Sequence, residues 1–240
     1  MGFWDRFDGD YESLFDRDPM YGEALDMMLE LSGDLAGKRA LDLGCGAGVF
    51  LSRLAEAFPN AELYGVDPSK KMVRRCERRL GHSARVRILR GSALRIPLPD
   101  EHVHAVLSNL ALHHVPPPER PACAREIARV LRPGGRLVYA DLFCDVEGPP
   151  EDPDRCRDII QKMVGKSLYD LDHGAYRTML LHLGDIPAVL TEDGEYFTTD
   201  RVWREAFREA GIERLEVKPV PPEEFGYRII TGIKAWTEEV

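Results

Sequence analysis

Several features are missing from this chain of 240 residues, and each absence argues against a class of protein. No apolar run approaches the roughly 18 residues of a membrane-spanning helix, so we expect no membrane association. The first ten residues, MGFWDRFDGD, are acidic and contain no apolar core, which argues against a secretory signal peptide. Gly2 is present, but Arg6 occupies the Ser/Thr position of a myristoylation signal.

Paired cysteines are also missing. The five cysteines are an odd number, are scattered along the chain and include no C-x-x-C pair. This usage argues against a disulfide framework and favours reduced thiols. We therefore expect a cytoplasmic protein.

Positive charge is in short supply. There are 32 Lys and Arg residues against 41 Asp and Glu residues, which gives a net charge of -9. This balance argues against broad electrostatic binding to nucleic acid, so we expect a small-molecule partner. Asn and Gln are scarce and Arg outnumbers Lys. A thermophilic source and a GC-rich genome explain this equally well, and the choice stays open.

What the chain does contain is a glycine-rich stretch at residues 40–50, ALDLGCGAGVF. A short apolar run ends near Asp42, and Gly44, Gly46 and Gly48 follow at alternate positions before an amphipathic segment. Glycine suits a tight turn because it reaches positive φ and carries no Cβ. The pattern predicts a strand, a turn that a ligand can approach closely, and a helix whose N-terminus offers N–H groups.

This motif does not match the dinucleotide fingerprint G-x-G-x-x-G, because Val49 stands where that fingerprint needs Gly or Ala. As D-x-G-x-G-x-G it resembles motif I of the class I S-adenosylmethionine (SAM)-dependent methyltransferases. The stretches IPLPDEHVHAV and LRPGGRL further along the chain resemble the same family. The resemblance implies an α/β fold with a Rossmann-like, doubly wound seven-stranded sheet, mostly parallel with an antiparallel last strand.

The same resemblance implies one domain over residues 1–240, with a helical N-terminal segment and a helical insertion after the fifth strand. We expect a helical cap at 1–37, a SAM-binding core at 38–143, a substrate lid at 144–198, and a closing helix and strand pair at 199–240. The acidic, proline-rich residues 144–154 at the start of the lid are typical of a loop.

Asp67 follows the second predicted strand, 19 residues after Gly48. A Rossmann-like domain places its ribose-binding carboxylate at about this distance. An N-cap of the next helix is the structural alternative, and the two roles are compatible.

The resemblance implies the other cofactor contacts residue by residue. Asp42 and the turn through Gly44, Cys45, Gly46 and Gly48 would hold the methionine part. Pro68 and Met72 would flank the adenine, Ser92, Ala93 and Leu94 would lie at its edge, and Asn109 and Leu110 would meet the amino acid part. Ser92 departs from the family, which has an acidic residue there, and a hydroxyl is a weaker acceptor than a carboxylate.

The histidines fall into two groups. His102 and His104 precede or begin the fourth predicted strand, whereas His113 and His114 follow it. Ligands bind at the carboxyl ends of parallel strands, so the second pair is expected at the site. No Cys, Asp or Glu lies near them at ligand spacing, so we expect no metal. They are candidate general bases for an acceptor that must lose a proton, and structural histidines are the alternative.

Substrate contacts are expected at Tyr11, Tyr21, Asp141, Phe143 and Tyr176, from the N-terminal segment, the end of the fifth strand and the insertion. The apolar segment LHLGDIP, residues 181–187, could instead form a homodimer surface.

We predict a methyltransferase that acts on an O, N, C or S nucleophile of a small molecule. SAM would be its cofactor and S-adenosylhomocysteine its product. The alternative is a SAM-binding protein of the same fold without methyl transfer. Arsenite methylation and a nicotinamide-dependent oxidoreductase are less consistent, because paired cysteines and a Tyr-x-x-x-Lys motif are lacking. The identity of the acceptor stays open.

Overall fold

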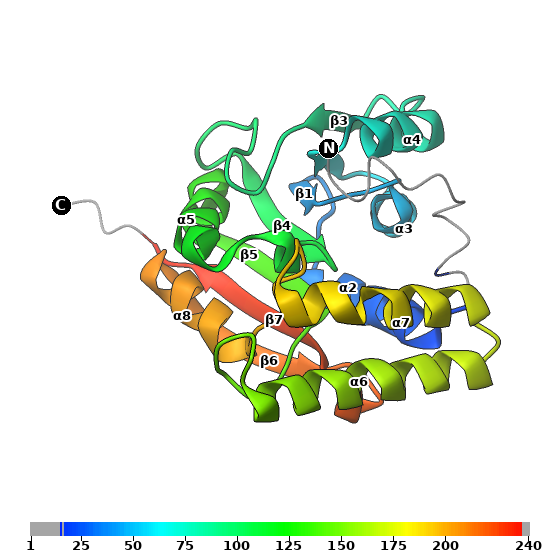
Figure 1. The fold of residues 1–240 in the computed structure, drawn as a ribbon. Coiled ribbons are helices and arrows are strands. Elements are labelled where there is room, and N and C mark those ends of the chain that lie inside the picture. The colour runs from blue at the N-terminus through cyan, green and yellow to red at the C-terminus, as the bar shows by residue number, and fades with distance from the viewer. Residues whose placement is uncertain (1–14, 16, 237–240) are drawn as a thin grey trace.

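The computed structural model describes residues 15 and 17–236, and its centre is a seven-stranded sheet (Figure 1). The strands are ordered β3-β2-β1-β4-β5-β7-β6. Their bounds are β1 Arg39–Leu43, β2 Glu62–Asp67, β3 Val86–Arg90, β4 Val103–Asn109, β5 Leu131–Leu142, β6 Ile212–Pro219 and β7 Tyr227–Lys234.

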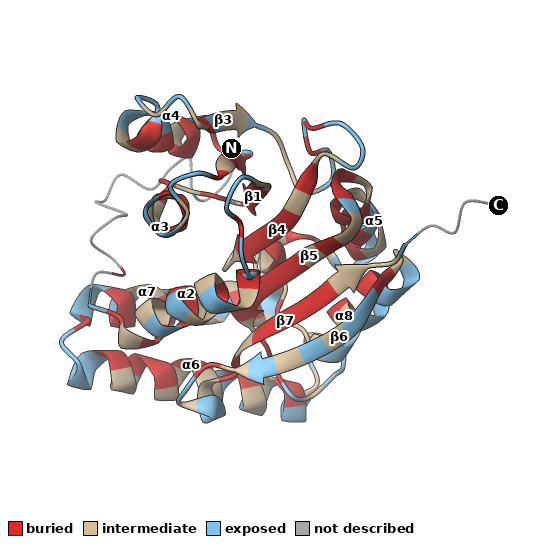
Figure 2. Ribbon diagram, turned by 180° about the vertical axis from the view of Figure 1, so that it is seen from behind, coloured by how far each residue is buried: buried red, intermediate tan, exposed pale blue. Residues whose placement is uncertain are grey.

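Strands β1 to β5 pair in parallel, and β7 alone runs against its neighbours β5 and β6. The central strands are covered on both faces, as the buried colour of β4, β5 and β7 in Figure 2 shows. Their near-continuous apolar sequences suit this environment. Strand β6, at the edge, alternates between exposed and less exposed residues.

Helices cover both faces of the sheet. Helices α5 (Arg120–Val130) and α8 (Asp200–Glu209) pack with a cluster that includes Tyr139 and Trp203. The other face carries α2 (Pro19–Ser32), α3 (Val49–Ala57) and α4 (Lys70–Leu80), which share a second cluster with Leu63 and Val138. The two clusters form the two apolar layers of a doubly wound fold.

The chain reverses its order along the sheet between β1 and β4, which places a topological switch point there. The connections from β1 lead outward to β2 and β3, and those from β4 lead the other way to β5. In open α/β sheets, ligands bind in the crevice at the carboxyl ends of such strands. The turn after Leu43 and the segment after Asn109 meet at this crevice.

The starts of α4 and α8 show which residues cap these helices. The N-cap of α4 is Ser69, whose hydroxyl accepts a hydrogen bond from the Met72 N–H at 3.3 Å, so Asp67 is not the cap. Asp200 is the first residue of α8 rather than its cap, which is Thr199. Its carboxylate instead pairs with Arg204 at 3.1 Å and with Arg228 at 3.5 Å.

The insertion after β5 contains two long helices, α6 (Pro153–Asp172) and α7 (Tyr176–Thr191), which pack against each other. The chain turns between the two helices at residues 173–175. Ile159 and Met163 of α6 share a small apolar cluster with Val189 of α7 and with Phe197. The pair lies in front of the sheet near the ends of β4 and β5 (Figure 1).

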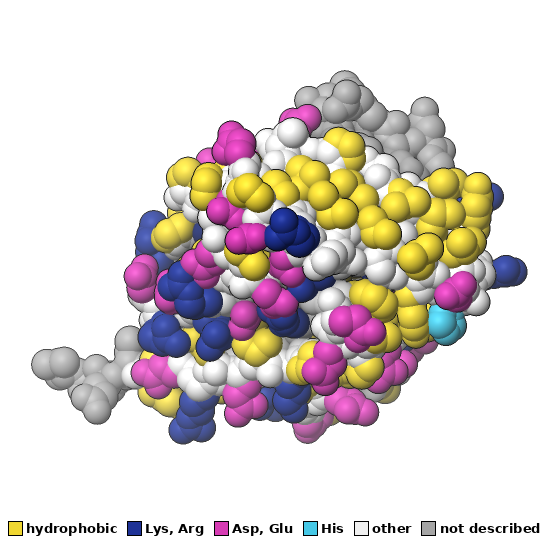
Figure 3. All heavy atoms as spheres, turned by 60° about the horizontal axis from the view of Figure 1, so that its bottom comes forward, with side chains coloured by type: hydrophobic (Ala, Val, Ile, Leu, Met, Phe, Trp, Pro, Cys, Tyr) yellow, Lys and Arg dark blue, Asp and Glu magenta, His cyan; other side chains and the backbone are white. Residues whose placement is uncertain are grey.

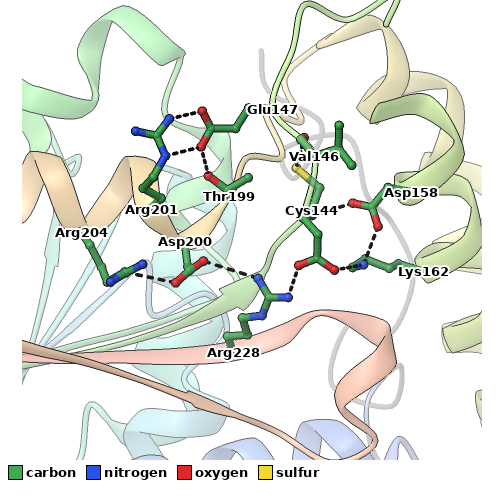
Figure 4. A network of polar contacts seen from close by, with 11 residues as sticks. Cys144, Val146, Glu147, Asp158, Lys162, Thr199, Asp200, Arg201, Arg204 and Arg228 are labelled. Carbon is green, nitrogen blue, oxygen red and sulfur yellow. Dashed lines mark hydrogen bonds and ion pairs between the residues drawn. The ribbon is translucent and has the colours of Figure 1, made fainter. Parts of the chain in front are cut away.

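Ion pairs attach the insertion to the rest of the molecule (Figure 4). Asp145 pairs with Arg228 of β7 and, at 2.6 Å, with Lys162 of α6. Glu147 pairs with Arg201 of α8. A second, buried group joins Lys166 of α6 to Asp170 and, at 2.7 Å, to Asp18 before α2. These contacts hold the acidic loop that was predicted before α6.

The predicted fold class is confirmed, including the seven strands, the antiparallel β7 and the helical insertion after β5. Among the helices of the described residues, none combines the length and the apolar character that crossing a bilayer requires.

Candidate active site

The turn between β1 and α3 has the backbone conformation that its glycines predict. Gly44, Gly46 and Gly48 have φ values of 78°, 52° and 85°. A Cβ on Gly44 would lie 2.3 Å from the Cβ of Ala111, and one on Gly48 would lie 2.7 Å from the sulfur of Cys76. Both the dihedral angles and the neighbours therefore require glycine at these two positions.

A cavity of about 230 Å³ lies between this turn, the end of β2 and the segment after β4. Ten of the predicted site residues line it: Gly44, Gly46, Asp67, Pro68, Met72, Ser92, Ala93, Leu94, Leu110 and His114. The sequence did not single out Ser69, Gly91, Ala111, Leu112, Val115, Pro116 and Glu119, which also line it. Most of these residues are next to predicted site residues in the chain. They could have been predicted by extending each motif into the turn that follows it.

Asp67 lies at the cavity and ties two of its walls together. The carboxylate accepts hydrogen bonds from the Gly46 N–H at 2.9 Å and from the Ser69 N–H at 2.8 Å. This position matches the predicted place of a ribose-binding carboxylate, at the end of the strand next to the glycine turn.

Asp42 lies beneath the turn and does not line the cavity. Its side chain is buried, and its Oδ2 has no hydrogen-bond partner among the described residues. Burial, and then the charge of Asp67, raise the pKa of Asp42 to about 8, although a hydrogen bond from the Leu51 backbone acts in the opposite direction. A buried carboxylate oxygen without a partner is costly, and a bound positively charged group would compensate for it.

Asn109 is oriented away from the predicted ligand contact. Its Oδ1 accepts a hydrogen bond from the Tyr227 hydroxyl at 2.7 Å. Leu110, in contrast, lines the cavity with a φ of 47°, a conformation that non-glycine residues seldom adopt. The cavity wall in this segment therefore begins at Leu110, and Asn109 is not part of it.

Next to the cavity, four titratable side chains form what we call the activation cluster: Asp141, His113, Glu195 and His114. His113 Nδ1 lies 2.6 Å from Asp141 Oδ1, and His113 Nε2 lies 3.2 Å from Glu195 Oε2. His114 Nδ1 lies 3.4 Å from Glu195 Oε1 and 2.9 Å from the Gly194 carbonyl. His114 also lines the cavity.

The sequence argument against a metal considered only the spacing of Cys, Asp and Glu along the chain. The fold brings two acidic side chains to the histidines from further away, Asp141 from the end of β5 and Glu195 from the loop after α7. Facing ligand atoms of His113, His114 and Glu195 lie within 4.8 Å of one another. Glu195 is 81 residues from His114 in the chain, so no local motif could have indicated it.

The cluster separates the pKa values of its two histidines. Burial lowers the pKa of His113, but the charges of Asp141 and Glu195 and their hydrogen bonds outweigh it, so that pKa is raised well above its usual value. Burial and the nearby charge of His113 lower the pKa of His114. Asp185 of α7 also feels the charges of this cluster, and burial together with Glu195 raises its pKa to about 7.

The loop that carries Glu195 is firmly attached. The Tyr196 N–H donates to the His113 carbonyl at 2.9 Å, and Arg120 donates to the Tyr196 carbonyl at 2.7 Å. Arg155 of α6 donates to the Phe197 carbonyl at 3.1 Å. Glu195 is thus held against the histidines by contacts on both sides of it in the chain.

The remaining predicted residues lie in different places. Asp141 is completely buried and bonds to His113 and to the Tyr139 hydroxyl, and Phe143 is buried in the core. Tyr21 stacks on Phe15, with 4.5 Å between ring centroids.

Tyr176, at the start of α7, is 57% exposed. Cys45 is buried, and Tyr11 lies outside the described residues. His102 and His104 lie at the amino end of β4, as predicted, where they contact Arg39 and Tyr64.

Comparison with known proteins supplies the identity of the family. A sequence profile of a methyltransferase domain matches residues 40–135. The 27-O-demethylrifamycin SV methyltransferase of Amycolatopsis mediterranei is 31% identical over 226 residues, which cover 90% of this chain and 78% of that protein. An uncharacterised methyltransferase of Geobacillus kaustophilus is 27% identical over 70% of this chain and 74% of its own length. Other curated relatives match over 33% to 58% of their own length.

Among solved structures, a SAM-dependent methyltransferase of Thermotoga maritima has the same fold. Its TM-score is 0.66 at 20% identity, with 96% of this chain and 97% of that chain covered. The fold, the glycine residues at the turn and the sequence similarity along most of the chain all indicate the same family. The chain belongs to the class I SAM-dependent methyltransferases.

Proposed function

We propose that SAM occupies the cavity beside the glycine turn and that its methyl group is transferred to a hydroxyl of a small molecule. When bound, SAM supplies an electrophilic methyl group on a sulfonium. The acceptor oxygen forms a bond to that carbon while the carbon–sulfur bond breaks, and the acceptor proton must leave. Alignment of the two reactants supplies much of the acceleration of such an in-line displacement.

The residues at the cavity suit SAM. Asp67 would accept hydrogen bonds from the ribose hydroxyls, and Pro68, Met72, Ala93 and Leu94 provide apolar contacts for the adenine. Ser92 lies at the cavity too, where its hydroxyl would face the adenine edge. The glycine turn lets the backbone approach the methionine part.

Asp42 provides the charge that the amino acid part needs. Its buried Oδ2 has no described partner, and an ammonium group nearby would supply a positive charge. Binding would then favour the ionised carboxylate and lower its raised pKa.

The observation that carries the transferase proposal is the activation cluster at the edge of the cavity. Asp141 holds His113 through a 2.6 Å hydrogen bond, an arrangement that fixes the tautomer and orientation of a catalytic imidazole. We assign the acceptor proton to this cluster, through the pair His113 and His114. Asp141, a predicted substrate contact, acts on this view as a positioning residue.

A small, largely apolar acceptor is supported by two observations. The cavity walls beyond the cofactor contacts include the apolar side chains of Leu112, Val115 and Pro116. One relative, 31% identical over 90% of this chain, is named as a 27-O-demethylrifamycin SV methyltransferase. The absence of excess positive charge agrees, because nucleic acid binding rewards Lys and Arg.

The cytoplasmic location and the homodimer remain predictions. Five free cysteines support the first. For the second, exposed apolar side chains gather on the surface that carries α6 and α7 (Figure 3), among them Leu168, Leu180 and Leu183. Light scattering of the purified protein measures its oligomeric state directly, and a monomer at all accessible concentrations would contradict the dimer.

The proposed function is tested by methyl transfer from labelled SAM to a panel of small hydroxyl acceptors. We expect at least one acceptor to be methylated, with turnover at least tenfold lower in Asp141→Asn. The known contribution of a positioned acid–base group is about 100-fold or more. Transfer to none of a wide panel, with SAM binding intact, would favour the alternative of SAM binding without transfer.

A further inference from the structure

We propose that His113, His114 and Glu195 form a binding site for one divalent transition-metal ion, with zinc and manganese as the chemical types that it suits. This inference rests on the proposed function only for the role of the ion. The binding of the ion is a property of the protein by itself.

The separations of the ligand atoms fit a metal site. Zinc lies about 2.0 to 2.2 Å from nitrogen and oxygen ligands, which places neighbouring ligands of a tetrahedron about 3.3 to 3.5 Å apart. Glu195 Oε2 lies 3.2 Å from His113 Nε2, and Glu195 Oε1 lies 3.4 Å from His114 Nδ1. These two separations are close to that value, and one ligand atom from each of the three residues lies within 4.8 Å of the others.

The second layer around these ligands has the composition of a metal site. A metal-binding histidine usually donates its other ring N–H to a carboxylate or a carbonyl. The other nitrogen of His113, Nδ1, lies 2.6 Å from the completely buried Asp141. Ligation through His114 Nδ1 would exchange its hydrogen bond with the Gly194 carbonyl for the metal bond.

The charge of the region also favours a cation. Asp141 and Glu195 bring two carboxylates to two histidines, and Asp185 of α7 adds a third nearby. The side chains of His113 and Glu195 are 11% and 14% exposed, so water screens their charges only in part. A divalent ion would neutralise the negative charge of this group.

Two imidazole nitrogens and one carboxylate make an open set of three ligands. Such sets bind zinc, iron or manganese and leave further positions for water or substrate. Because His114 lines the cavity, such an open position would lie next to it. With the ion bound, His113 and His114 would be its ligands and would not take the acceptor proton. An acceptor hydroxyl held at the open position would instead have a lower pKa and would lose its proton to water.

The test is calorimetric titration of the purified, chelator-treated protein with Zn²⁺ and with Mn²⁺, at pH 7.5 and in the presence of S-adenosylhomocysteine. We expect one ion per chain and a loss of affinity of at least tenfold in Glu195→Gln, which keeps the size of the side chain but removes its charge. His104→Ala is the matched control. It removes a histidine with metal-like H-x-H spacing from the other end of the sheet, and it should bind the ion as the wild type does.

Folding is checked by affinity for S-adenosylhomocysteine, which Glu195→Gln should retain. His114→Gln is a second variant, which should also lose affinity for the ion at least tenfold. No binding of either ion at millimolar concentration, or equal binding by the wild type and both variants, would overturn the site.

Different results would refute the metal site and the proposed function. Stoichiometric binding of an ion without methyl transfer to any acceptor would refute the proposed function and leave the site standing. Full transfer by chelator-treated protein would overturn the role of the ion and leave the proposed function standing.

Discussion

The cofactor side and the acceptor side of the cavity are built in different ways. The cofactor side consists of short segments that each follow a strand, namely the turn at Gly44–Gly48, the end of β2 at Asp67, and residues 91–94 after β3. The acceptor side joins His113 to Asp141 and to Glu195, which are 28 and 82 residues further along the chain. The cofactor side can therefore keep its affinity for SAM when residues of the acceptor side are changed. Substitutions on each side test whether cofactor affinity and methyl transfer depend on separate residues.

The largest effect is expected at the glycine turn. Gly44→Ala places a Cβ 2.3 Å from that of Ala111, at a φ of 78°. We expect affinity for S-adenosylhomocysteine to fall at least 100-fold, because the turn must move to relieve both the contact and the dihedral strain. Calorimetric titration measures this affinity.

Gly184→Ala is the matched control for that variant. Gly184 lies in α7, and a Cβ there would meet nothing within 4 Å. Affinity should be unchanged, and stability should rise slightly because alanine has the higher helix propensity, by about 1 kcal/mol. An equal loss of affinity in both variants would mean that cofactor affinity does not depend on the conformation of the glycine turn.

The buried ion pairs that attach the insertion should affect the stability of the protein more than its affinity for the cofactor. Lys166→Met leaves Asp18 and Asp170 buried without their cation. Removing one partner of a buried ion pair costs about 3 to 5 kcal/mol, so the free energy of unfolding in urea should fall by that order. At low temperature, where the variant is folded, cofactor affinity should change less than threefold. A larger loss of affinity would show that the two sides of the cavity depend on each other.

Asp141→Asn tests whether the acceptor side affects turnover without affecting the affinity for SAM. The amide keeps the shape of the side chain but cannot hold His113 with a charge, so turnover should fall by about 100-fold while the affinity for SAM stays within twofold. Steady-state kinetics and calorimetry give the two values. A parallel loss of both would place Asp141 on the cofactor side.

A further effect is a pH dependence of stability at Asp42. Its pKa is about 8 in the folded protein and lies near 3.8 when the side chain is in water. Because the folded-state pKa is the higher one, Asp42 lowers stability progressively as pH rises from about 4 to 8. Asp42→Asn should therefore raise the melting temperature more at pH 8 than at pH 5.

The same substitution should weaken the binding of S-adenosylhomocysteine, since the buried carboxylate beneath the turn no longer attracts the ammonium group of the ligand. A gain in melting temperature that does not depend on pH would contradict the raised pKa of Asp42.

The cofactor side could be predicted from the sequence, and most of the acceptor side could not. The strands, the glycine turn and the place of Asp67 follow from local rules, since strand periodicity, positive φ and the position after a strand act within a few residues. The pairing of Asn109 with Tyr227 and the burial of Phe143 depend on packing between distant segments. Glu195 was missed for the same reason, because its place is set by contacts of Tyr196 and Phe197 with α5 and α6.

The separation of the two sides is tested most directly by calorimetric titration with SAM, S-adenosylhomocysteine and NAD of three proteins: the wild type, Asp67→Ala and Glu195→Gln. We predict that the wild type binds both adenosyl ligands and not NAD. Asp67→Ala should lose this binding at least tenfold, and Glu195→Gln should keep it within twofold. Normal binding by Asp67→Ala, or an equal loss in Glu195→Gln, would contradict the division of the cavity into a cofactor side and an acceptor side.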